Sequence, residues 1–225
     1  MRTLFSRNTI DFLIENRIQN SKTWFEEHRT QYNEFVLAPL VSITEDLSSV
    51  ILDIDDKLMC SPKAGGSISR IWRDTRFSKD KSLYRDSMWC SFIREKGVGL
   101  PEFFFVISAE GFLYGSGYYS ANATSMGSIR NLILSDDKDF QTALFTSENQ
   151  NLFKLEGDMY KKSRYPDSDD RKRNWLERKT ICFIHENNDF ELLFSNDLSS
   201  AIAEGFKILA PVYNFLIKAE ELIRK

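Results

Sequence analysis

Residues 103–120 decide the fold and read Phe103-Phe-Phe-Val-Ile-Ser108, Ala109-Glu110 and then Gly111-Phe-Leu-Tyr-Gly-Ser-Gly-Tyr-Tyr-Ser120. Aromatic and β-branched residues favour strands, and a short turn between two such stretches favours an antiparallel pair. The preceding stretch Ser87–Arg94 has the same character. We therefore predict an antiparallel meander over residues 87–120.

Helical patterns surround this predicted sheet, because apolar residues recur there three or four positions apart. The N-terminal quarter contains three such segments, which end at Gln19-Asn20, at Pro39 and at the acidic stop Asp53–Asp56. Proline lacks an N–H and crowds the preceding turn, so Pro39 should kink or restart its helix. We predict a single α+β domain over residues 1–225, with a mainly antiparallel sheet flanked by N- and C-terminal helices. Its later elements are helices in 122–145, divided at Ser135–Asp137, a strand at Thr180–Ile184 and a final helix at Leu198–Ile223 containing Pro211.

The composition indicates an ordinary globular protein. Of the 225 residues, 42% are hydrophobic and 28% charged, which excludes the disordered and fibrous classes. Eighteen Phe residues supply enough rings for a core without disulfides. Cys60, Cys90 and Cys182 are widely spaced and form no C-x-x-C pair, so we expect reduced structural thiols and no zinc site. No stretch approaches the ~20 apolar residues of a membrane span, and we expect a cytoplasmic protein without a membrane partner.

The net charge hides two basic segments. The whole chain has a formal charge of -3, which argues against a nucleic-acid coat. Residues 63–85, the first basic segment, hold seven basic and two acidic side chains, and residues 161–179, the second basic segment, hold eight and four. The rest of the chain carries -12. A ligand responds to the charge within about 8 Å at physiological salt, so each basic segment is a candidate site for an anion.

The first basic segment has the most unusual spacing. Its cations recur every three residues from Arg70 to Lys79, with Asp74 between them, so neither a strand nor a helix places all of them on one face. Gly65-Gly66 and Ser78 make a sustained helix less favourable. We predict a strand that enters a well-ordered loop.

Arginine binds both carboxylates and phosphates, so this segment has two interpretations. In the first, surplus charge holds a small phosphate- or carboxylate-bearing ligand, and Asp74 or Asp80 acts as base or metal anchor if the protein is an enzyme. In the second, the protein is a non-catalytic interaction module. Its basic segment is then either an ion-pair lattice, in which the two acids neutralise their neighbours and Trp72, Phe77 and Tyr84 are the anchors, or a weak binding surface for a protein or a nucleic acid. A single-stranded nucleic acid is a less favoured partner, because the chain lacks the usual recognition motifs. The predicted ligand-binding residues are Arg70, Arg73, Arg76, Lys79, Lys81 and Tyr84.

At this segment the chain resembles a known family. The run Arg70-Ile-Trp-Arg-Asp-Thr-Arg-Phe-Ser-Lys-Asp-Lys-Ser-Leu-Tyr-Arg85 is similar to the hallmark of the largely bacterial domain-of-unknown-function family 2461, with Leu83 where a proline is common. The resemblance covers nearly the whole chain and implies one unit of fold, without an activity, substrate or cofactor. Its other parts are Trp24-Phe25-Glu26, Gly115–Tyr119, Ile129-Arg130, Leu155–Asp158, Tyr165-Pro166 and Arg178-Lys179.

The remaining candidates are interpreted as structural. His28 lies on an aromatic helical stripe and His185 ends a predicted strand, so we expect hydrogen-bonded histidines rather than bases or ligands. Gly115-Ser-Gly117 lacks the spacing of a phosphate loop and is interpreted as a bend or bulge, although amides at the helix capped by Asn122 are a hypothetical second anion contact. No residues have metal-ligand spacing, and no cofactor is implied. The second basic segment predicts a solvated loop or, beside the first, one groove walled by Tyr160, Tyr165 and Trp175.

Overall fold

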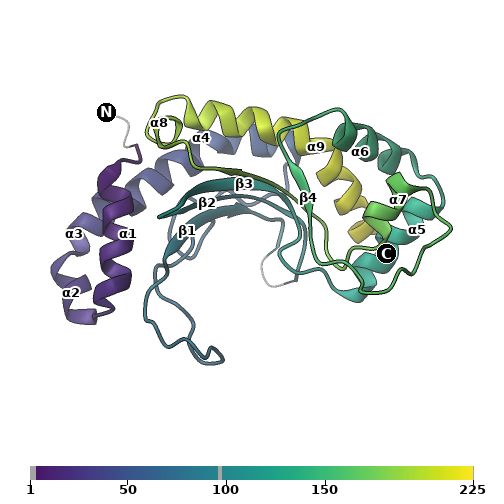
Figure 1. The fold of residues 1–225 in the computed structure, drawn as a ribbon. Coiled ribbons are helices and arrows are strands. Elements are labelled where there is room, and N and C mark those ends of the chain that lie inside the picture. Colours follow the sequence, from purple (N-terminus) through teal and green to yellow (C-terminus); the bar gives the residue numbers. More distant parts are fainter. Residues whose placement is uncertain (1–3, 96–97, 225) are drawn as a thin grey trace. The chain divides into compact units, whose positions relative to one another are not determined.

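The computed structural model describes residues 4–95 and 98–224, which form helices and a sheet (Figure 1). The chain divides into two compact units. Unit 1 comprises the residues up to Phe92, Phe104–Tyr114 and Glu186–Ala203, and unit 2 comprises Ile93–Phe103, Gly115–His185 and the residues from Glu204 onward. Each unit consists of three separate segments of the chain. The single-domain organisation stays a prediction.

Five strands of the described residues form one antiparallel sheet in the order β1-β2-β3-β5-β4. The first three strands are the predicted meander. The predicted strand near residue 180 begins two residues later than expected, and the short β4 pairs with it so that Lys154 lies opposite Ile184. The predicted α+β class is confirmed. The bounds are β1 Ser87–Phe92, β2 Glu102–Ser108, β3 Gly111–Gly117, β4 Lys154–Glu156 and β5 Cys182–Asn187.

Alternate burial along the strands distinguishes the two faces of the sheet. In β2, Phe103, Phe105 and Ile107 are completely buried, whereas Phe104 and Val106 between them are partly exposed. Successive side chains of a strand point to opposite faces, so one face belongs to the core and the other is open. In unit 1, helix α4 (Ala38–Ile54) packs against β1.

The N-terminal helices follow the predicted segments, with one local difference. Helix α1 ends at Asn20, whose φ of 45° is left-handed, as the polar break predicts. Ile18 is 74% exposed, because the buried face of α1 ends at Asn16. His28 interrupts the second predicted helix. The bounds are α1 Arg7–Gln19, α2 Lys22–Glu27 and α3 Arg29–Tyr32.

Pro39 restarts the helix as predicted, after a π-turn. The π-helical segment η1 (Asn33–Leu37) joins α3 to α4, and the Thr9 hydroxyl donates a hydrogen bond of 2.6 Å to the Phe35 carbonyl within it. Pro39 lies in the first turn of α4, and the Phe35 carbonyl four residues before it, which an N–H at position 39 would otherwise bond, accepts the Thr9 hydroxyl instead.

The helical run Arg29–Ile54, which α3, η1 and α4 form together, is long and apolar enough to cross a membrane by length and composition alone. The sequence pattern did not lead us to expect such a stretch. Its Leu40, Leu47 and Ile51 side chains are fully buried, as in the core helix of a globular protein. We therefore treat the run as part of the core, and the cytoplasmic location stays a prediction.

The later helices are arranged largely as predicted. The expected division at Ser135–Asp137 is confirmed, and Asn122 caps the first of the two helices by accepting a hydrogen bond of 2.8 Å from the Ser125 N–H. The final helix continues through Pro211. Helix α7, in the second basic segment, was not predicted. The bounds are α5 Ala123–Leu134, α6 Lys138–Glu148, α7 Asp170–Leu176, α8 Phe190–Leu193 and α9 Leu198–Ile223.

Candidate functional site

The first basic segment forms two extended arms in unit 1 and a loop that joins them. A backbone hydrogen bond of 2.9 Å from the Arg73 N–H to the Leu83 carbonyl ties the arms together. We call residues 67–85 the basic hairpin and residues 74–82 its tip loop. Figure 1 shows the hairpin within the long loop that leads into β1 and extends away from the strands. The predicted loop is present, but the predicted strand is not, because residues 67–85 form only isolated bridges such as that between Trp72 and Tyr84.

An aromatic cluster anchors the hairpin to the N-terminal helices of unit 1. Tyr84 is completely buried, with its ring centroid 5.1 Å from that of Phe25 and 4.5 Å from that of Trp72. Its hydroxyl donates to the Ser21 carbonyl at 3.3 Å, so Tyr84 faces the core. The prediction of Phe77 as a third anchor was wrong, because the tip loop carries this ring away from the core and leaves it 96% exposed.

Asp80 organises the tip loop. Its carboxylate accepts hydrogen bonds from the Ser82 hydroxyl at 2.5 Å and the Ser82 N–H at 2.9 Å. It also pairs with Arg17 at 2.9 Å and with Arg73. The Ser82 hydrogen bonds and then the Arg17 guanidinium hold the pKa of Asp80 well below its usual range. Asp80 therefore stays ionised near neutral pH and is unsuited to act as a base.

Asp74 and Arg76 form a second pair in the tip loop. The Arg76 Nε and Nη2 atoms donate to the two carboxylate oxygens of Asp74 at 3.0 and 2.7 Å. These hydrogen bonds lower the pKa of Asp74 to about 2. Both candidate acids of the first basic segment are therefore engaged with arginines, as the ion-pair lattice interpretation predicts.

The Asp74 pair gives a pH-dependent prediction. A carboxyl pKa that is depressed from 3.8 to about 2 in the folded protein stabilises the loop above pH 3.8 and loses this contribution as the pH falls toward 2. We expect NMR titration of the Asp74 carboxyl to give a midpoint near 2, and Arg76→Gln to move it toward 3.8. An unchanged midpoint in the variant would contradict the pairing.

Part of the positive charge of the hairpin stays without a carboxylate partner. Among the described residues, the side chains of Arg70 and Lys79 make no hydrogen bond or ion pair. The Lys81 ammonium donates to the Thr75 carbonyl at 2.8 Å, which leaves its charge uncompensated. The exposed Phe77 ring has the Arg76 guanidinium 5.8 Å from its centroid and is otherwise open to solvent. The predicted ligand residues thus separate into paired Arg73 and Arg76, buried Tyr84, and the unpaired cations Arg70, Lys79 and Lys81.

The second basic segment, in unit 2, uses its arginines to hold backbone carbonyls. Arg130 of α5 donates to the Leu176 carbonyl at 3.0 Å and to the Arg178 carbonyl at 2.6 Å. Arg178 donates to the Gly157 carbonyl at 2.7 Å. Trp175, expected to form a groove wall, is 1% exposed because α7 turns it into the core. The segment is therefore a structured loop and short helix.

Glu177 is a buried carboxylate that sequence reasoning missed. It accepts hydrogen bonds from the Ser163 hydroxyl at 2.6 Å and from the N–H groups of Arg164 and Tyr165 at 2.8 Å. Burial alone would raise the pKa of Glu177, but these hydrogen bonds outweigh the effect of burial. The pKa is therefore below its usual value, and the carboxyl group stays ionised. No spacing signal marked Glu177, and Arg130 was marked only by the family resemblance.

The two histidines and Cys90 of β1 are held by hydrogen bonds, ring stacking or burial, as expected for residues with a structural role. His28 stacks on Trp24 with ring centroids 4.0 Å apart, and its Nδ1 atom donates to the Trp24 carbonyl at 2.8 Å. His185 Nδ1 likewise donates to the Leu152 carbonyl at 2.9 Å. Burial raises the pKa of the Cys90 thiol to about 12, which keeps it protonated. Within residues 4–95 and 98–224, no three His, Cys, Asp or Glu side chains gather where they could hold a metal ion.

The fold and the site define the class of protein: an α+β protein with an antiparallel sheet and a basic hairpin docked on its N-terminal helices. The chain belongs to the family of conserved hypothetical proteins DUF2461, whose family model matches residues 8–215. This confirms the resemblance noted in the sequence. A search of curated proteins finds no match.

Proposed function

We propose that the protein is a non-catalytic binding protein whose basic hairpin holds a phosphate- or carboxylate-bearing ligand. The observation that carries the proposal is the uncompensated charge of Arg70, Lys79 and Lys81, since the two acids of the hairpin are already bound by arginines. The engagement of Asp74 and Asp80 favours binding over catalysis, because neither carboxylate is prepared to accept a proton near neutral pH.

The exposure of the hairpin bears on the kind of ligand. Arg70 lies on one arm, and Lys79 and Lys81 lie in the tip loop, all exposed to solvent. Charges spread in this way suit a ligand with several anionic groups better than one enclosed anion. Exposed charge pairs are individually weak, so several must act together and binding should weaken as salt is added.

Calorimetric titration with tripolyphosphate at low salt tests this proposal. We expect the double variant Arg70→Gln/Lys79→Gln to bind about fivefold more weakly, because two exposed charge pairs of about 0.5 kcal/mol each are lost. Lys57→Gln, at another exposed lysine of unit 1, is the control and should bind like the wild type. No binding by the wild-type protein, or equal weakening in the control, would overturn the proposal.

A second candidate ligand is single-stranded nucleic acid, favoured specifically by the exposed ring of Phe77 among cations. Bases stack on exposed aromatic rings, whereas inorganic phosphates do not. The same titration with oligothymidylate distinguishes the two ligands. Weaker oligothymidylate binding by Phe77→Ala, with unchanged tripolyphosphate binding, supports the nucleic acid, and equal binding of both ligands to variant and wild type excludes it.

A further inference from the structure

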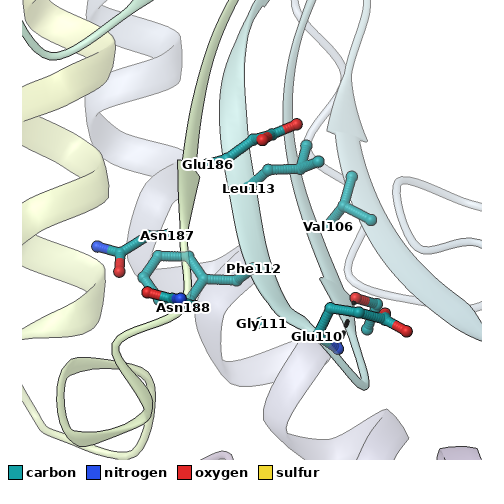
Figure 2. A pocket seen from close by; sticks show the side chains of 9 residues that line it. Val106, Glu110, Gly111, Phe112, Leu113, Glu186, Asn187 and Asn188 are labelled. Atoms are coloured by element: carbon teal, nitrogen blue, oxygen red, sulfur yellow. Dashed lines mark hydrogen bonds between the residues drawn. The ribbon is translucent and has the colours of Figure 1, made fainter.

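A cavity of about 430 Å³ opens within unit 1, away from the tip of the basic hairpin. It lies on the open face of the sheet, where β2 and β3 meet the end of β5. Figure 2 shows the side chains of Val106, Leu113 and Glu186 next to one another, one from each strand, with Glu110 at the turn between β2 and β3. Its volume lies in the range of pockets that bind small organic molecules.

The backbone brings these strands unusually close. Gly111 begins β3 with a φ of +140°, and a Cβ atom at this position would lie 2.4 Å from the Asn187 carbonyl oxygen. Only glycine permits this approach, because any side chain would meet the neighbouring backbone. The approach places Leu113 beside the end of β5 and so joins the floor of the cavity to Glu186.

The floor of the cavity is apolar. Val106 and Leu113 are partly exposed, whereas their neighbours Phe105 and Phe112 are buried in the core with ring centroids 6.0 Å apart. The alternation of the strands thus leaves two aliphatic side chains on the open face. They offer a ligand an apolar surface that becomes buried on binding.

The rim of the cavity is acidic. Glu110 and Glu186 are exposed, and neither side chain has a hydrogen-bond or ion-pair partner among the described residues. Neither Lys nor Arg is among the described residues that line the cavity. Two carboxylates without a third acidic ligand make a poor metal site, but they attract an organic cation and repel anions.

We infer that this cavity binds a small amphipathic amine, with the apolar body on Val106 and Leu113 and the ammonium group at its acidic rim, where the carboxylates of Glu110 and Glu186 attract it. A neutral ligand of the same shape would use only the floor, and a carboxylic acid would meet repulsion at the rim. The cavity therefore selects the opposite charge from the basic hairpin, and the inference does not depend on the proposed anion site.

Three matched probes test the inference by NMR titration: phenethylamine, the neutral 2-phenylethanol and the anionic 3-phenylpropionate. We expect saturable binding of the amine at millimolar concentration, weaker binding of the alcohol and the weakest binding of the acid. The double variant Glu110→Gln/Glu186→Gln should weaken amine binding about fivefold and leave alcohol binding unchanged, since each exposed charge pair contributes modestly. Leu113→Ala should weaken both.

Glu191→Gln provides the matched control, because Glu191 is an exposed glutamate of unit 1 outside the cavity. Its amine binding should equal that of the wild type. The inference is overturned if the amine binds no more tightly than the alcohol, or if the control weakens amine binding as much as the double variant. Absence of saturable amine binding to the wild-type protein overturns it as well.

Discussion

Replacing Trp175 with alanine is expected to lower the free energy of unfolding by about 3–5 kcal/mol. Trp175 is 1% exposed, and its ring centroid lies 5.6 Å from that of Phe140, 5.4 Å from that of Phe183 and 6.0 Å from that of Phe215. Removing the indole eliminates these contacts and leaves a cavity that the surrounding rings only partly fill. Urea denaturation followed by circular dichroism measures the loss.

Two further variants make this result specific to the core of unit 2. Trp175→Phe retains one ring and should cost clearly less than Trp175→Ala. Phe145→Ala removes a ring that is 65% exposed and should change the free energy of unfolding by no more than about 0.5 kcal/mol. A loss for Trp175→Ala as small as that for Phe145→Ala would show that the indole is not packed as described.

Gly117→Ala is expected to destabilise the protein by at least about 3 kcal/mol, through backbone strain and overpacking that each cost ~1–3 kcal/mol. Gly117 ends β3 with a φ of +147°. An added Cβ atom would lie 2.4 Å from the Ile181 carbonyl oxygen and 2.5 Å from the Cys182 Cα atom. Neither backbone atom can move without disturbing the hydrogen bond of 2.9 Å from the Tyr118 N–H to the Ile181 carbonyl.

Gly127→Ala is the matched control in the same unit. Gly127 lies within helix α5, and an added Cβ atom there would meet nothing within 4 Å. This change should stabilise the protein by about 0.5–1 kcal/mol, because alanine is the better helix former. Thermal unfolding of the two variants should therefore shift in opposite directions, and a neutral Gly117→Ala would contradict the close approach of the two strands.

The sequence predicted the surroundings of Gly117 better than those of Trp175. The glycines of Gly115-Ser-Gly117 were interpreted as a bend or bulge, and the structure explains Gly117 by a close backbone approach. Trp175 was expected in the wall of a groove, although it belongs to the core. Its flanking charges, Arg173 and Glu177, resemble those of a surface segment, and only packing against α6 and β5 reveals the buried indole.

The basic hairpin was also predicted only in part from the sequence. Spacing alone predicted an ordered segment with more bases than acids and named the cations that could meet a ligand. The spacing did not indicate Arg17 as a partner of the hairpin, because it lies 63 residues from Asp80 in the chain but pairs with it at 2.9 Å. Phe77 was expected in the core because it is aromatic, but its place at the tip of the loop exposes it.

The sequence by itself determined the α+β class, the meander of β1 to β3, most of the helices and the family, because periodicity, turns and caps depend on residues close together in the chain. The tertiary structure alone decided which arginines are engaged, that Glu177 is a buried acceptor and that Val106, Leu113 and Glu186 share one cavity. Such groupings join residues from distant parts of the chain, and no local spacing rule specifies a contact that forms only when the elements pack.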